Sequence, residues 1–183
     1  KGYSPDWIQY IKNSMSMIAY NFTMKRMLDD YIERFYNKLA VRSAVLKKDN
    51  YAKAKEIAAW KEEVAAHWDS FEVCSFTSDA DLAANGPVVG KEASFNLVID
   101  RHELQGQLGA EIVITKRDPE KNEQVVVKKQ EFELKREEGD KMYFELHLTP
   151  NEAGNMEIGF RIFPKNPDLP HRMDFAFIRW IQL

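Results

Sequence analysis

The stretch from Met142 to Phe163, MYFELHLTPNEAGNMEIGFRIF, decides the fold class of this chain. Every second residue of its first part is apolar, and the same alternation returns after the segment TPNEAG. A period of two places the apolar side chains on one face of a β-strand. Pro, Asn and Gly are the residues that reverse the chain direction in turns. The stretch therefore predicts two antiparallel strands, joined by a turn, that bury one face.

The same pattern covers most of the chain after Phe71. Turn-forming residues recur about every ten residues, and no stretch between them has a helical period. We expect strands at Glu72–Thr77, Glu92–Asp100, Ala110–Lys116, Gln124–Lys135, Met142–Thr149, Met156–Phe163 and Phe175–Gln182. About seven short strands in about 110 residues predict an antiparallel β-sandwich of immunoglobulin-like type.

The part before Asp69 has a different period, with apolar residues three and four positions apart. That spacing predicts helices with one apolar face. Ser4-Pro5-Asp6 predicts a helix start, with a capping oxygen on Ser4, a proline in the first turn and an acid after it. Thr23 is a candidate cap for a second helix.

A third helix is expected from about Tyr51 to His67. Its buried stripe would consist of Ile57, Trp60, Val64 and Trp68. The sequence therefore predicts an α+β chain with a three-helix segment in residues 1–70 and a sandwich domain in residues 71–183. The boundary is expected near residues 69–71.

Composition and charge narrow the class of protein. The net charge is −3, and basic and acidic residues are interspersed, so we expect no nucleic-acid partner. No run of apolar residues approaches the ~18 that span a bilayer, so no membrane association is expected. Cys74 is the only cysteine, which excludes an internal disulfide and fits a reducing compartment such as the cytoplasm. Because Cys74 lies within an expected strand, we predict a buried structural thiol.

The sequence contains no recognisable catalytic or metal-binding motif. His67, His102, His147 and His171 lack the spacings that bind zinc, and we interpret them as scattered surface or packing residues. The segment 79–86, DADLAANG, lacks the ligand spacing and the final glutamate of a calcium loop. Glycine-rich phosphate loops and a nucleophile elbow are also missing. We therefore predict no catalytic, cofactor-binding or metal-binding residue in these 183 positions.

Aromatic residues leave one alternative open. Sandwich modules that bind sugars expose flat rings, and the strand half contains Tyr143, Phe163, Phe175 and Trp180. Trp7, Trp60 and Trp68 lie on helical stripes and are expected in the core. Trp180 alternates with Ile178, which also favours the core. A glucan-binding face is the alternative interpretation of these strand aromatics.

Two stretches of the chain share features with a known family. The first contains Trp7, the segment from Ser14 to Ile18, Phe22, Arg26-Met27 and Tyr31. It resembles the C-terminal end of the catalytic region of bacterial α-glucan (glycogen) phosphorylases, which are pyridoxal-phosphate-dependent glucosyltransferases. The chain departs from that pattern at Tyr20, where many relatives have a proline.

The second stretch runs from Gly159 to Trp180, GFRIFPKNPDLPHRMDFAFIRW. It resembles the end of the β-rich extension that follows the catalytic region in the shorter bacterial members. The resemblance implies a parent enzyme that cleaves terminal α-1,4 links with phosphate and releases glucose 1-phosphate. It also implies that the pyridoxal phosphate lysine and the phosphate-binding loops lie upstream of Lys1, so these 183 residues alone should be inactive.

The resemblance implies structural roles for the matched residues, in helices that brace the catalytic domain of the parent. We therefore expect three partners: the upstream catalytic domain of the same chain, an α-glucan, and a second copy of the chain bound through its helical half. The sandwich would serve as a spacer, an oligomerisation contact or a glucan-docking surface. Two alternatives stay open, a non-enzymatic binding or scaffolding module and the tail of a glycogen synthase-type glycosyltransferase.

Overall fold

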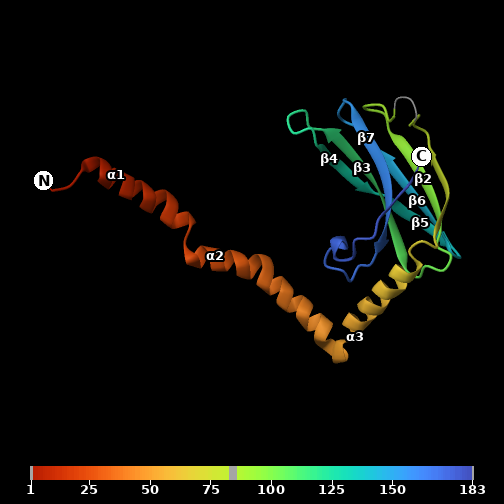
Figure 1. Ribbon diagram of the computed structural model, residues 1–183, viewed down its shortest axis with the longest axis horizontal. Helices are drawn as coiled ribbons and strands as arrows, with labels where there is room; N and C mark the ends of the chain where they lie inside the picture. Colours follow the sequence, from red (N-terminus) through yellow and green to blue (C-terminus); the bar gives the residue numbers. More distant parts are fainter. Residues whose placement is uncertain (1, 83–85, 183) are drawn as a thin grey trace. The chain divides into compact units, whose positions relative to one another are not determined.

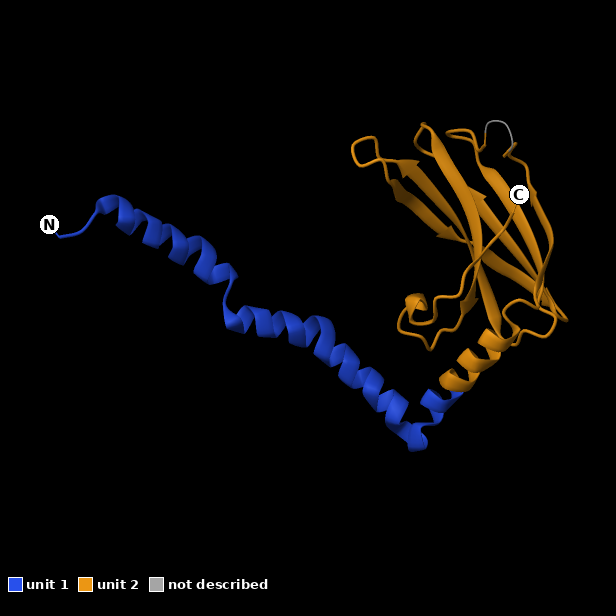
Figure 2. Ribbon diagram, viewed as in Figure 1, with its two compact units in different colours: residues 1–56 blue, residues 57–183 orange. Residues whose placement is uncertain are grey.

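A computed structural model describes residues 2–82 and 86–182 (Figure 1). The chain divides into two compact units, residues 1–56 and residues 57–183 (Figure 2). Within the described residues, no helix has both the length and the hydropathy of a membrane-crossing segment. The expected domain boundary near residues 69–71 stays a prediction, which a truncation proposed in the Discussion tests.

The first unit is helical. Its elements are α1 (Pro5–Asn13), the π-helical η1 (Ser14–Ala19), α2 (Met24–Tyr31), the π-helical η2 (Ile32–Tyr36) and the first part of α3 (Asn37–His67). The Thr23 side chain accepts a hydrogen bond from the backbone nitrogen of Arg26 at 3.2 Å, which confirms the expected cap. The expected helix start at Ser4-Pro5-Asp6 is confirmed, because α1 begins at Pro5 with Ser4 as its N-cap residue and Asp6 in its first turn. The Ser4 side chain makes no capping hydrogen bond, so that part of the prediction is wrong.

A break in helical geometry interrupts α3 at residues 48–51. Asp49, Asn50 and Tyr51 all have positive φ angles, between 50° and 63°. Asp and Asn adopt this left-handed conformation more readily than most residues, which explains why the helix breaks at this point.

No described residue before Ile57 is buried. Trp7, which was expected in the core, is 64% exposed, so that prediction is wrong. The helical period of its neighbours is real, but residues 1–56 supply no second layer that covers the apolar stripe.

The second unit is a sandwich of two antiparallel four-stranded sheets. One sheet has the order β1-β2-β6-β5 and the other the order β4-β3-β7-β8. The strands are β1 (Glu72–Ser78), β2 (Ala93–Asp100), β3 (Gln107–Arg117), β4 (Gln124–Glu131), β5 (Glu133–Glu138), β6 (Lys141–Leu148), β7 (Met156–Lys165) and β8 (Arg179–Trp180). The expected antiparallel sandwich is therefore confirmed at the level of its layers.

Two of the expected strands differ from those observed. The expected strand Gln124–Lys135 divides at Phe132 into β4 and β5, which belong to different sheets. The Phe132 side chain is buried, and its backbone nitrogen donates to the carbonyl oxygen of Ala110 at 2.8 Å, so the chain crosses between the sheets there. The expected strand Phe175–Gln182 shrinks to β8, because the 3₁₀-helix η3 (Arg172–Phe175) occupies its beginning.

The core lies between the two sheets. The alternation that opened the sequence analysis is confirmed in β6, where Met142, Phe144, Leu146 and Leu148 are all buried. Phe160 of β7 lies at the centre of an aromatic cluster, with ring centroids 5.3 Å from Phe95 and 6.1 Å from Phe132.

The end of α3 belongs to this core. Ile57, Val64 and Trp68 are buried, as the expected stripe required, and Val64 and Trp68 contact the core of the sandwich. Trp60 is half-buried and its ring packs 5.3 Å from that of Phe175. Residues 57–67 are thus helical and, within the second unit, pack as part of the sandwich core.

The prediction of a buried Cys74 is wrong, because this thiol is exposed. The pairing of β1 with β2 shifts between Val73 and Ser75, which marks a β-bulge at Cys74. A bulge inserts an extra residue and breaks the alternation of faces, so the period of two fails at this position.

Candidate binding site on the outer face of one sheet

The histidines lie apart, each with a local partner. His67 contacts Glu63 at 3.2 Å, His102 lies 3.5 Å from Asp100, and His147 lies 3.1 Å from Glu145. The His171 ring nitrogen Nδ1 accepts from the backbone nitrogen of Met173. Among the described residues, no group of three or more His, Cys, Asp and Glu side chains is arranged to hold a metal ion.

The acidic segment that resembled a calcium loop is held by its own hydrogen bonds. Asp79 Oδ1 accepts from the backbone nitrogen of Ser94 at 2.8 Å, and the Ser78 hydroxyl accepts from that of Ala80 at 3.0 Å. Asn85 lies outside the described residues. Asp79 therefore anchors the loop to the start of β2.

The outer face of the sheet β4-β3-β7-β8 carries a concentration of charged and aromatic side chains. Ile112 of β3 and Phe160 and Ile162 of β7 face the core, so their neighbours Glu111 and Arg161 face outward. Arg161 pairs in register with Trp180 of β8, and its guanidinium carbon lies 5.5 Å from the centre of the Trp180 ring.

A buried carboxylate joins two arginines on this face. The Glu111 side chain is 5% exposed. Its Oε1 accepts from Nε of Arg161 at 2.5 Å and also pairs with Nη2, while its Oε2 pairs with Nη1 of Arg172 at 2.7 Å. Burial raises the pKa of Glu111, but the hydrogen bonds and positive charges of Arg172 and Arg161 together outweigh burial and hold that pKa below its ordinary value. Glu111 is therefore ionised at neutral pH.

Two glycines allow aromatic rings to lie directly on this face. A Cβ atom on Gly159 would lie 2.8 Å from Cζ3 of Trp180, and one on Gly109 would lie 2.6 Å from the Phe163 ring. Such distances are shorter than van der Waals contact, so only glycine leaves room for the rings. The guanidinium of Arg172 in turn lies 4.6 Å from the centre of the Phe163 ring.

Trp180 is 52% exposed, so its expected place in the core is wrong. The apolar alternation near the end of the chain has the opposite phase to the expected one. Phe177 and Ile181 pack against the core, whereas Ile178 and Trp180 face outward and are exposed. The pairing of β8 with β7 decides which of these two sets of residues faces the core. The residue pattern of β8 alone does not show how β8 pairs.

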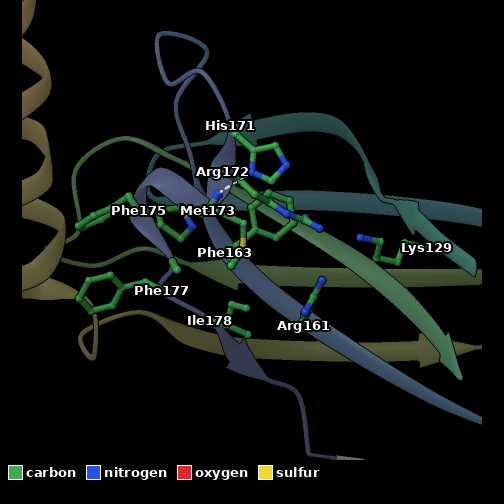
Figure 3. A pocket seen from close by; sticks show the side chains of 11 residues that line it. Lys129, Arg161, Phe163, His171, Arg172, Met173, Phe175, Phe177 and Ile178 are labelled. Atoms are coloured by element: carbon green, nitrogen blue, oxygen red, sulfur yellow. Dashed lines mark hydrogen bonds between the residues drawn. The ribbon is translucent and has the colours of Figure 1, made fainter. Parts of the chain in front are cut away.

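A cavity of about 110 Å³ lies beside these residues (Figure 3). It is lined by Lys129, Arg161, Phe163, Pro164, His171, Arg172, Met173, Phe175, Ala176, Phe177 and Ile178. Figure 3 shows Arg161 and Ile178 on one side of the cavity and His171 and Arg172 on the other. The segment that contains η3 thus forms one wall, which the Glu111–Arg172 pair attaches to β3.

The other three strand aromatics are less exposed than Trp180. Phe163 is buried, Phe175 packs against Trp60, and Tyr143 lies on the other sheet under the guanidinium of Arg136, 4.0 Å from its centre. Neither Glu111 nor either of its two arginines was predicted as a site residue. The one signal available was a lone acid inside the apolar run LGAEIVI of β3.

The described residues do not fit pyridoxal phosphate. A Schiff-base lysine needs burial to lower its pKa, and every described lysine is exposed or half-exposed. The outer face supplies hydrogen-bond donors, an exposed aromatic ring and a neutralised carboxylate. This arrangement can bind a polar ligand, and no nucleophile with an adjacent base lies within it.

The comparisons with known proteins agree with the features quoted from the sequence. Residues 68–182 match the family model described as the glycogen phosphorylase C-terminal domain. The maltodextrin phosphorylase of Thermococcus litoralis is 34% identical over 67 residues, which is 37% of this chain and 8% of that protein. The chain thus spans only a small part of the length of this curated relative. No solved structure matches the chain. Because the family model covers more than half of the chain, the chain belongs to the glycogen phosphorylase C-terminal domain family, which confirms the resemblance to the C-terminal region of α-glucan phosphorylases.

Proposed function

We propose that this chain is the non-catalytic C-terminal part of an α-glucan phosphorylase. Such an enzyme breaks the terminal α-1,4 link of glycogen or a maltodextrin with phosphate and releases glucose 1-phosphate. The family match over residues 68–182 carries the proposal, and the relative named maltodextrin phosphorylase supports the substrate class. The catalytic part, upstream in the same polypeptide, would hold pyridoxal phosphate, and the enzyme would act in the cytoplasm.

The non-catalytic role is supported by the chemistry of the described residues. Among the described residues, Glu111 is the one buried acid and is neutralised by two arginines, and every described lysine is at least partly exposed. The 183-residue chain mixed with glycogen, phosphate and pyridoxal phosphate should therefore form no glucose 1-phosphate. The full-length protein that ends in this chain should form it. Turnover by the chain alone, or a full-length protein without phosphorolysis, would contradict the proposal.

The strand order supports an immunoglobulin-like sandwich. In that fold the strands A, B, E and D form one sheet, and C, F and G form the other, with C′ added beside C in larger members. Naming β1 to β8 as A, B, C, C′, D, E, F and G turns the observed orders into A-B-E-D and C′-C-F-G. For the helical segment we propose three helices, separated at residues 22–23 and at residues 48–51.

The helical segment would serve as the contact with the catalytic part. Most of its large apolar residues are exposed, among them Trp7, Met15, Phe22 and Phe35. Contiguous apolar surface beyond a few hundred Å² is uncommon on monomers and usually marks an interface. The upstream catalytic domain of the same polypeptide is the proposed occupant in the full-length enzyme.

Without that domain a second copy would cover the same surface, most simply as a symmetric dimer. Light scattering of the 183-residue chain should then give about twice its mass of 21.3 kDa. A truncated chain of residues 57–183, which lacks this surface, serves as the control and should be monomeric. A monomeric 183-residue chain would contradict self-association.

The sandwich would not contribute to the active site and would instead serve in assembly or in binding the glucan polymer. Removing residues 57–183 from the full-length enzyme should leave phosphorolysis of short maltodextrins intact and weaken either assembly or affinity for glycogen. A folded enzyme that loses activity on short substrates would show that the sandwich contributes to the active site.

A further inference from the structure

The Trp180 ring is held in place by two residues of β7. The ring lies against the backbone of Gly159, where a Cβ atom would approach it to 2.8 Å. The guanidinium carbon of the paired Arg161 lies over the ring, 5.5 Å from its centre. About half of the Trp180 side chain, 52%, is open to solvent. This ring is preorganised, so a ligand that stacks on it does not have to immobilise the side chain first.

Hydrogen-bond donors lie on the same face of the sheet. Glu111 accepts from two nitrogens of Arg161 and from one of Arg172. Each guanidinium carries five N–H donors in a fixed fork, so both arginines have donors beyond those that Glu111 accepts. Because Glu111 holds both side chains on the face, these donors have defined positions. Ile178, two residues before Trp180, is also exposed and lines the cavity.

We propose that this outer face binds a chain of α-1,4-linked glucose, with one pyranose ring stacked on Trp180. A pyranose presents a face of C–H groups, which packs on the negatively polarised face of an indole, and a rim of hydroxyls, which accept from guanidinium donors. Binding sites for such ligands combine an apolar floor with a few placed polar groups. The choice of an α-glucan rests on the proposed function, whose substrate is this polymer.

Native gel electrophoresis through glycogen tests the site without catalysis. Glycogen in the gel should retard the 183-residue chain, and Trp180→Ala should weaken the retardation about tenfold, because it removes the stacking surface. Trp180→Phe, which keeps an aromatic ring, should retain most of the binding. Val88→Ala is the control, because Val88 is also an exposed apolar residue and lies in the loop before β2, and it should bind as the unchanged chain does. Trp180 is half exposed, so its removal should leave the melting temperature nearly unchanged.

Other outcomes overturn the proposal. Lack of retardation of the unchanged chain would do so, and so would equal retardation of Trp180→Ala. Equal competition by a soluble β-1,4-glucan would exclude selectivity for the α-linked polymer. Loss of retardation at high salt would contradict stacking as the main contact, because screening weakens ionic contacts far more than stacking. A full-length enzyme without phosphorolysis would contradict the proposed function. An active enzyme whose affinity for glycogen is unchanged by Trp180→Ala would contradict only this site.

Discussion

Glu111 in the middle of β3 and Arg172 at the start of η3 form an ion pair of 2.7 Å, although they are far apart in the sequence. Glu111 lies on a buried part of the sheet face, and Arg172 comes from the segment that returns the chain from β7 to β8. The pair therefore attaches an irregular segment, which has few backbone hydrogen bonds of its own, to the longest strand of the sheet. Arg161 completes the cluster from the neighbouring strand.

We expect Glu111→Gln to lower the free energy of unfolding by about 2 kcal/mol, because it leaves two partly buried guanidinium groups without their counter-charge. Urea denaturation followed by tryptophan fluorescence measures this change. Glu131→Gln is the matched control, since Glu131 pairs with Lys165 on the exposed part of the same face. An exposed pair contributes about 1 kcal/mol or less. Equal effects of the two substitutions would contradict a special role for Glu111.

The low pKa of Glu111 predicts loss of stability in acid. The folded state lowers this pKa from an ordinary value of 4.5, so ionised Glu111 stabilises the fold at pH values above 4.5. That contribution disappears as the pH falls below 4.5 and through the lower pKa of the folded state. Melting temperatures from pH 7 down to pH 3 should therefore fall more steeply at the acid end for the unchanged chain than for Glu111→Gln. Parallel curves would show that Glu111 does not carry this dependence.

Gly106 should tolerate no side chain. Its φ angle is +105°, and a Cβ atom there would lie 2.8 Å from Nε1 of Trp60. We expect Gly106→Ala to destabilise the sandwich by about 2 kcal/mol through backbone strain and displacement of the Trp60 ring. Gly139→Ala separates the two causes, because Gly139 also has a positive φ, +61°, but nothing lies within 4 Å of the added atom. Its cost should be about 1 kcal/mol, and a cost equal to that of Gly106→Ala would exclude the steric contribution of Trp60.

The end of α3 should be required for a stable sandwich. Val64 and Trp68 are buried in the core, and burying one large apolar side chain contributes about 1.5–3 kcal/mol. A truncated chain of residues 57–183 should unfold cooperatively in urea, whereas residues 71–183 should be at least about 3 kcal/mol less stable. Equal stability of the two chains would place the start of the domain at the boundary expected from the sequence, near residues 69–71.

Cys74 should react in the folded protein. Its side chain is exposed at the bulge of β1, so a thiol reagent should modify one equivalent per chain without denaturant. Ser75, its neighbour on the bulge, is exposed as well, so the modification should leave the melting temperature nearly unchanged. A thiol that reacts only after unfolding would contradict the exposed position.

The sequence by itself determined the elements whose pattern is local. The alternation in Met142–Leu148 and the stripe of Ile57, Val64 and Trp68 both predicted the residues that the structure buries. The period of side chains along a strand or helix depends only on backbone geometry, so it can be seen in a short window. The quoted features at the two ends of the chain likewise pointed to the phosphorylase family that the comparisons show.

Only the tertiary structure decided which face of each element is covered. The phase of β8 leaves Trp180 outside, the bulge at Val73–Ser75 exposes Cys74, and the crossing at Phe132 divides one expected strand between two sheets. The cluster of Glu111 with Arg161 and Arg172 joins residues up to 61 positions apart on three segments, β3, β7 and η3. Strand register and long-range ion pairs depend on contacts between segments that are distant in sequence, so a local pattern cannot contain them.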